Sequence, residues 1–276
     1  MATEFVLTDA DFNTIRKLVY DHTGINLSSG KKDMIYSRLT RRLRQLGLSQ
    51  FKEYLAVLDD EHSDEIGNFI NSVTTNLTSF FREMHHFEHL KNELLPLLMR
   101  IRADERQIRI WSAGCSTGEE PYSIAMTVKE TIPDSAGWDV RILATDLDTN
   151  VLETASRGVY AEDRLNGVPK DKLKRWFKRG KGATAGKVRI HQDLRDMIIF
   201  KQLNLMQKWP IKPGVDILFC RNVVIYFDKP TQKVLFDRYA NILADHGRML
   251  IGHSETLYNV CDRFDLLGHT VYKKKC

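Results

Sequence analysis

The 276-residue sequence predicts an α/β fold, in which a doubly wound, mostly parallel sheet carries a small antiparallel β insert and follows an all-α bundle. Two patterns lead to this prediction. Apolar residues recur at helical spacing through the first ninety positions, whereas short apolar runs alternate with helical stretches after about residue 100. With 42% hydrophobic and 28% charged residues, the composition is typical of a globular protein and excludes a disordered chain.

The first ninety residues predict helices only. Thr8 and Asp11 have the spacing of a capping box that begins a helix, and Gly24 is a suitable residue to end it. A second amphipathic helix is expected over 31–46, and a further one over 66–73. The second helix carries basic side chains away from its apolar stripe, namely Arg38, Arg41, Arg42 and Arg44.

The alternating region predicts the sheet. Strands are expected at 108–111, 140–144, 215–220, 249–251, 264–267 and 270–273. Helices are expected at 121–130, 149–157 and 231–244. The alternation is interrupted between 159 and 203, where a short helix at 171–178 and a glycine-rich turn at 180–186 precede strand-like segments at 188–190 and 197–200. We expect this stretch to form the antiparallel insert.

The loop after the first predicted strand is a candidate ligand site, because open α/β sheets bind ligands at the carboxyl ends of their strands. Gly114 and Gly118 give the spacing G-x-x-x-G, and Glu119 and Glu120 begin the following helix. Two carboxylates would repel a diphosphate but suit a ligand with an ammonium group. Asp146 ends the second strand, where it can accept hydrogen bonds from ribose or, alternatively, cap the next helix. The pattern favours S-adenosylmethionine over NAD.

Five ordered segments resemble the chemotaxis-receptor methyltransferases, the CheR family. They are 75–83 (TNLTSFFRE), 111–123 (WSAGCSTGEEPYS), 144–148 (ATDLD), 219–228 (FCRNVVIYFD) and 251–255 (IGHSE). The resemblance implies a Rossmann-like class I methyltransferase sheet that binds S-adenosylmethionine and yields S-adenosylhomocysteine. It also implies a receptor-recognition domain over 1–75, a linker at 76–92 that contributes to the cofactor site, and a methyltransferase domain over 93–276 with its insert at 159–203.

The resemblance further implies the residues of the site. Tyr226 and Arg82 are expected to be catalytic, with Tyr226 facing the reacting methyl group and Arg82 suited to the cofactor carboxylate. Either Glu119 or Glu120 is expected to hold the cofactor ammonium. The cofactor-binding set is completed by Asn76, Thr78, Gly114, Asp146, Asn204, Leu205, Arg221 and Asn222. Asn76 and Thr78 could instead cap a helix, and Leu205 could be an ordinary core residue.

The implied reaction is methyl transfer to glutamate side chains of chemoreceptors, giving methyl esters. Glutamate is already ionised at neutral pH, so no general base is needed. By resemblance, Arg38, Arg41, Arg42 and Arg44 would approach the acidic methylation helices of the receptor. The segment with Arg179, Gly180 and Gly182 resembles an insert that binds the C-terminal pentapeptide of some receptors as an added strand.

Some features of the sequence are also compatible with other functions. His85, Glu88 and His89 match the H-x-x-E-H pattern of zinc metallopeptidases, but a third ligand is not evident, so we expect no metal. The net charge of +5 permits nucleic acid without requiring it, and we expect none. A sensor that only binds the cofactor is a further alternative. Neither a secretory signal nor an apolar stretch of ~20 residues is evident, so we expect no membrane insertion and a cytoplasmic protein.

Overall fold

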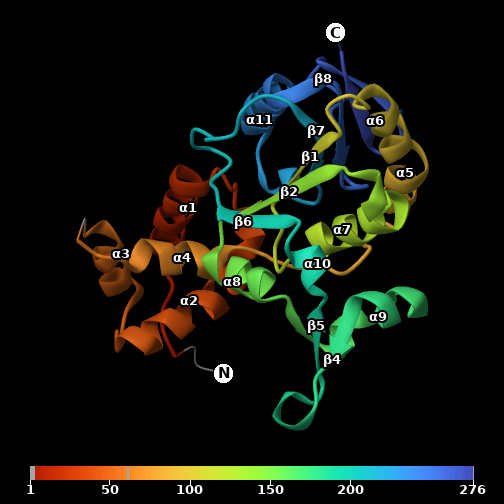
Figure 1. Ribbon diagram of the computed structural model, residues 1–276. Helices are drawn as coiled ribbons and strands as arrows, with labels where there is room; N and C mark the ends of the chain where they lie inside the picture. The colour runs from red at the N-terminus through yellow and green to blue at the C-terminus, as the bar shows by residue number, and fades with distance from the viewer. Residues whose placement is uncertain (1–3, 61, 276) are drawn as a thin grey trace.

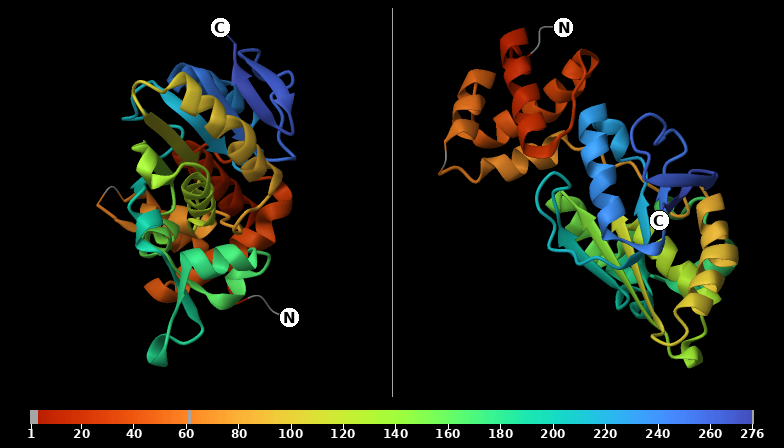
Figure 2. Two further views of the ribbon diagram at one scale, coloured as in Figure 1. Left: turned by 45° about the vertical axis from the view of Figure 1, so that its right-hand side comes forward. Right: turned by 90° about the horizontal axis from the view of Figure 1, so that it is seen from above.

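The computed structural model describes residues 4–60 and 62–275. Cys276 lies outside the described residues, and so do residues 1–3, on which part of the prediction about a secretory signal falls. A helical N-terminal part lies beside a larger α/β part, as the two views of Figure 2 show. Within the described ranges, no helix combines the length and apolar character that a membrane crossing requires.

The N-terminal part packs its helices around one apolar core. They are α1 (Asp9–Thr23), α2 (Lys32–Leu46), α3 (Phe51–Asp59) and α4 (Glu65–Val73). The capping box of Thr8 and Asp11 is confirmed, and Gly24 ends α1 with φ 74°, a left-handed conformation that glycine adopts without strain. Ile15, Leu39 and Phe69 are fully buried in the core. The helix α3 was not predicted.

The central sheet has seven strands in the order β6-β2-β1-β7-β8-β10-β9. Their bounds are β1 (Gln107–Ala113), β2 (Asp139–Asp146), β6 (Ile198–Gln202), β7 (Val215–Cys220), β8 (Leu243–Ile251), β9 (Phe264–Gly268) and β10 (Val271–Lys274). The first five strands in this order are parallel, and β10 and β9 add an antiparallel edge. The strand order reverses between β1 and β7, which places the expected ligand crevice at their carboxyl ends.

Helices cover both faces of the sheet (Figure 1). They are α5 (His85–His89), which continues through a π-helical turn (Leu90–Leu94) into α6 (Leu95–Ile101), and α7 (Glu119–Thr131), α8 (Thr149–Arg157), α10 (Gln192–Arg195) and α11 (Lys229–Ile242). Ile110 and Trp111 are neighbours on β1, and they lie in two different apolar cores. This alternation confirms the doubly wound sheet.

The insert is a separate three-stranded antiparallel sheet, β3-β5-β4, that projects below the main sheet in Figure 1. Its elements are β3 (Val159–Ala161), α9 (Lys170–Trp176), β4 (Phe177–Arg179) and β5 (Lys187–Ile190). The prediction that 197–200 belongs to the insert is wrong, because β6 pairs in parallel with β2 at the edge of the main sheet. An apolar edge strand has the same composition in either sheet. Here α10 returns the chain to β2, so the insert ends before residue 203.

Candidate functional site

A cavity of about 560 Å³ lies at the carboxyl ends of the central strands, between the sheet, the segment 73–82 and the N-terminal helices. Its size is typical of small-molecule sites. Most of the predicted site residues line it: Asn76, Thr78, Arg82, Gly114, Glu120, Asp146, Asn204, Leu205, Arg221, Asn222 and Tyr226. Arg38 of α2 lines the same cavity, so both parts of the chain contribute to one site.

Gly114 allows the loop after β1 to approach the segment after β7. Its φ is 81°, and a Cβ atom at this position would lie 2.4 Å from Cγ2 of Val223. Any larger residue would therefore be strained and would push the two loops apart. The glycine brings the carboxyl ends of β1 and β7 together at one wall of the cavity.

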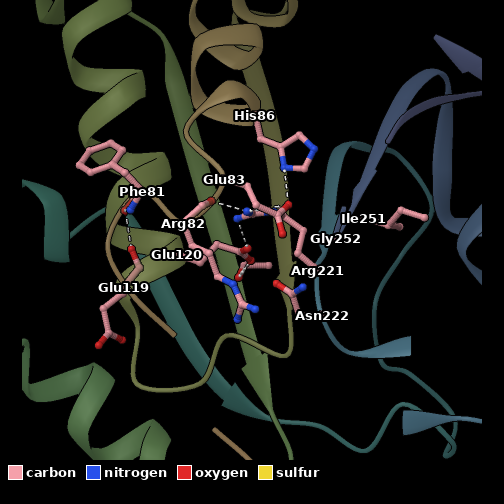
Figure 3. Close-up of polar contacts among 12 residues, drawn as sticks. Phe81, Arg82, Glu83, His86, Glu119, Glu120, Arg221, Asn222, Ile251 and Gly252 are labelled. Atoms are coloured by element: carbon pink, nitrogen blue, oxygen red, sulfur yellow. Dashed lines mark hydrogen bonds and ion pairs between the residues drawn. The ribbon is translucent and has the colours of Figure 1, made fainter. Parts of the chain in front are cut away.

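The two carboxylates at the start of α7 point in different directions, as Figure 3 shows. Glu119 accepts a hydrogen bond from Thr117 Oγ1 (2.6 Å) and pairs with Arg164, whereas Glu120 lines the cavity. Glu120 accepts hydrogen bonds from Ser112 Oγ (2.7 Å) and from Arg221 Nη1 (3.0 Å). Successive helical residues are about 100° apart, which separates the two side chains. The structure thus places Glu120, and not Glu119, at the cavity.

Arg221 connects two carboxylates behind this wall, of which Glu120 is buried and Glu83 is nearly so. Its Nη1 bonds Glu120, and its Nη2 lies 3.2 Å from Oε2 of Glu83. Burial raises the pKa of Glu120. Burial also acts to raise the pKa of Glu83, but the hydrogen bond from His253 Nδ1 (2.8 Å) and the charge of Arg221 hold it at about 2. The role of Glu83 was missed, although it ends the motif at 75–83.

Asp146 ends β2 at the cavity. Its carboxylate accepts backbone N–H bonds from Ser116 (2.8 Å) and Asp148 (3.0 Å), and burial raises its pKa. The N-cap of α8 is Asp148, which accepts from the backbone of Asn150 (2.9 Å). The alternative that Asp146 caps the next helix is therefore wrong. Asp146 is a carboxylate at the cavity wall whose further lone pairs can accept hydrogen bonds from a ligand.

The linker is held against the sheet by its polar side chains. Asn76 Nδ2 donates to Asp148 Oδ2 (2.7 Å), and Ser116 Oγ donates to the Asn76 carbonyl (2.8 Å). Arg82 Nη1 donates to the carbonyl of Leu77 (3.0 Å). The N-cap of α5 is Met84, without a side-chain cap. Asn76 and Thr78 therefore do not cap this helix, and both line the cavity.

The opposite wall comes from the segments after β6 and β7. Asn204 Nδ2 donates to the carbonyl of His22 (2.6 Å), which ties this wall to α1. Leu205 is buried in an apolar core and also lines the cavity, so its core role is confirmed and its contact with the cofactor stays a prediction. Tyr226 ends a 3-10 turn (Val224–Tyr226), and its carbonyl accepts from the Asn26 backbone (2.8 Å).

Glu255 shapes this second wall from behind, and its role was also missed. Its buried carboxylate accepts backbone N–H bonds from Gly252 (2.6 Å), Asn222 (2.9 Å) and Ile225 (3.3 Å). These bonds hold Asn222 in a left-handed conformation with φ 58° and support the turn that carries Tyr226. The signal in the sequence is the segment 251–255, which was recognised as a motif without a role for its last residue.

Comparison with known proteins decides the family. Residues 76–273 match the family model described as "CheR methyltransferase, SAM binding domain", and residues 10–74 match "CheR methyltransferase, all-alpha domain". The chain belongs to the CheR methyltransferase family. A chemotaxis protein methyltransferase of Escherichia coli is 45% identical over 276 residues, covering 99% of this chain and 93% of its own. Chemotaxis protein methyltransferase 2 of Pseudomonas aeruginosa is 46% identical, covering 98% and 94%.

This CheR-family enzyme is thus a chemotaxis protein methyltransferase that uses S-adenosylmethionine. The cavity fits that cofactor in its chemistry. The buried Glu120 and the half-buried Asp146 place two carboxylates at the inner end, where a cationic group would stabilise their charge. The carboxylates suit an ammonium group and sugar hydroxyls better than phosphates.

The basic residues of α2 divide into three groups. Arg38 Nη1 donates to the carbonyls of Val73 and Thr74, both at 2.7 Å, and reaches the cavity. Arg42 pairs with the buried Glu65 (2.6 Å), and Arg44 pairs with Glu4. Arg41 is exposed. The predicted basic ridge is therefore not uniform, because Arg42 is held within the helical domain.

The H-x-x-E-H segment does not assemble a metallopeptidase site. Among the residues that the structure describes, the group compatible with a metal is Glu83, His85 and His86, which omits Glu88 and His89. His89 instead pairs with Glu93 at 2.9 Å. The zinc peptidase alternative therefore loses its geometric basis.

Proposed function

We propose that the enzyme transfers methyl groups to glutamate side chains of chemoreceptor cytoplasmic domains and forms methyl esters. The observation that supports this most is the separation of negative from positive side chains within this cavity. Glu120 and Asp146 lie at its inner end, whereas Arg38 of α2 and Tyr226 line its other end. One end suits a cationic cofactor, and the other suits an incoming carboxylate.

Each side chain has an assigned part in cofactor binding. Glu120 holds the ammonium group, Asp146 accepts from the ribose, and Arg82 pairs with the cofactor carboxylate. Asn204 and Leu205 flank the adenine, since they form the wall opposite the linker. The remaining contacts come from the linker, the glycine loop and the segment after β7: Asn76, Thr78, Gly114, Arg221 and Asn222.

The protein orients the nucleophile and excludes water. Bound S-adenosylmethionine supplies an electrophilic methyl group. The Tyr226 hydroxyl and the Arg38 guanidinium hold the receptor glutamate, which is ionised at neutral pH and needs no base. Partial burial lowers the pKa of Arg38, and the nearby Tyr226 opposes that shift. Because the reaction removes two opposite charges, a partly desolvated mouth favours it.

Receptor contact would extend beyond the cavity. Arg41 is exposed on α2 and carries the basic charge that faces solvent. In the described part of the chain, β4 pairs with β5 alone, which leaves an edge that can add a peptide strand. Arg179 ends that edge strand with an exposed side chain, and the tight turn at Gly180 and Gly182 follows it. Calorimetry with receptor C-terminal pentapeptides tests this tether, and absence of heat with every such peptide would remove it.

The decisive experiment is incubation with a radiolabelled methyl donor and receptor-containing membranes. Base-labile label on receptor glutamates is expected, whereas label on added RNA or cofactor binding without any transfer would contradict the proposal. Tyr226→Phe and Arg82→Ala should each lower turnover about a hundredfold with little change in stability. Wild-type rates in both variants would refute these two roles.

A further inference from the structure

Two large apolar side chains are exposed where the cavity opens. Leu77 is 78% exposed and Ile225 is 50% exposed, and both line the cavity. Leu77 belongs to the linker, and Ile225 directly precedes Tyr226. Met34, one helical turn before Arg38 on α2, also lines the cavity and is only partly buried. Apolar side chains from three separate segments therefore surround one opening.

The backbone under these side chains is held in place. The Leu77 carbonyl accepts from Arg82 Nη1 (3.0 Å), and the Ile225 N–H donates to Glu255 Oε1 (3.3 Å). Each apolar residue thus lies beside a polar residue of the site. Several exposed apolar side chains gathered around one opening are typical of a surface that a partner covers, whereas a single exposed one is not.

We propose that Met34, Leu77 and Ile225, here termed the apolar rim, pack against non-polar side chains that flank the target glutamate on a receptor helix. This inference rests on the proposed function and deepens it. Lys31 and Arg38 line the same cavity, so the opening combines positive charge with apolar surface. That combination fits an acidic residue with apolar neighbours one helical turn away.

The rim therefore determines which glutamates are selected. A receptor helix carries many acidic side chains, and positive charge alone would attract all of them. A glutamate with polar neighbours would leave Leu77 and Ile225 in contact with water, whereas one with apolar neighbours would bury them. The charges bring the helix to the enzyme, and the rim distinguishes between its sites.

The test compares each rim residue with an exposed residue of similar size elsewhere on the surface, Leu77 with Leu266 and Ile225 with Val234. Leu77→Ser and Ile225→Ser alter the rim, whereas Leu266→Ser on β9 and Val234→Ser on α11 change side chains that are each 60% exposed elsewhere. Steady-state kinetics with the receptor cytoplasmic fragment gives KM and kcat. Calorimetry with S-adenosylhomocysteine gives cofactor-site affinity.

The rim variants should raise the receptor KM about tenfold or more, with cofactor-site affinity unchanged, and the controls should leave both unchanged. Replacing the apolar neighbours of a receptor glutamate by serine should raise the receptor KM of the wild-type enzyme. The same replacement should not raise the KM of Leu77→Ser any further. If the wild-type enzyme labels the receptor but the rim variants have the same receptor KM as the controls, the proposed role of the rim is wrong and the proposed function stands. If wild type labels no receptor glutamate, both are overturned.

Discussion

The inner end and the mouth of the cavity differ in how their side chains are held. At the inner end, Arg221 and Glu120 are buried, Glu83 is nearly so, and Arg221 pairs with both carboxylates. At the mouth, Arg38 and Tyr226 are half-buried, and Leu77 is exposed. The difference indicates that the cofactor end is organised before any ligand arrives, whereas the mouth can adapt to a protein substrate.

The largest expected effect is a loss of stability when the ion-pair network at the inner end is broken. Arg221→Met leaves Glu83 and Glu120 buried without their shared cation, so the free energy of unfolding should fall by about 3–5 kcal/mol. Arg141→Met is the control, because that side chain is 55% exposed and its ion pair is a surface one. Chemical denaturation measures both. A loss below about 1 kcal/mol for Arg221→Met would show that the network does not stabilise this end.

The next largest effect is a pH dependence of stability that comes from His86, which lies beside Glu83 with 3.4 Å between Nδ1 and Oε2. Burial, reinforced by the charge of Arg221, lowers the pKa of His86 from 6.5 to about 4. Between these values the unfolded chain binds a proton that the folded chain does not, so stability falls as pH falls through this window, by about 3 kcal/mol in all.

Denaturation curves from pH 7 to pH 4 measure this dependence, and His86→Gln should remove that part of the slope. Glu83 contributes little to the slope between pH 7 and about pH 4.5. Its pKa of about 2 means that its contribution to stability is lost only below about pH 4.5. An unchanged slope in His86→Gln would contradict the assignment.

The smallest expected effect is a loss of activity toward the receptor when the charge of Arg38 is removed from the mouth of the cavity. Arg38→Gln keeps an amide that can donate to the linker carbonyls but removes the charge, so kcat/KM for receptor should fall about tenfold, roughly 1.4 kcal/mol. Stability and S-adenosylhomocysteine affinity should stay near wild type. Lys233→Ala on α11 is the control, because it removes one positive charge from an exposed position outside the cavity lining. Equal kinetics in the two variants would show that Arg38 does not act on the substrate.

Local signals predicted much of the fold. The capping box at Thr8, the stop at Gly24 and the strand–helix alternation depend on neighbouring residues, and the structure confirms them. The assignment of 197–200 to the insert failed because the choice of partner strand is a long-range property. Family resemblance predicted the residues of the cavity, and their individual roles remain predictions.

The missed features depend on contacts between distant residues. Glu83 meets Arg221 across 138 positions, and Glu255 reaches the backbone of Asn222 across 33. Arg42 resembles a surface charge until Glu65 on another helix is placed beside it. The choice between Glu119 and Glu120 likewise required the orientation of α7 relative to the sheet, which neighbouring residues do not determine.

A calorimetric comparison of Glu120→Gln with Glu119→Gln tests the central assignment most directly. Both changes remove a buried carboxylate from adjacent positions at the start of α7, so they form a matched pair. S-adenosylhomocysteine should bind Glu120→Gln about thirtyfold more weakly than wild type, because its ammonium group loses a charged partner, and should bind Glu119→Gln within a few-fold of wild type. Equal losses in the two variants, or a larger loss in Glu119→Gln, would contradict the account.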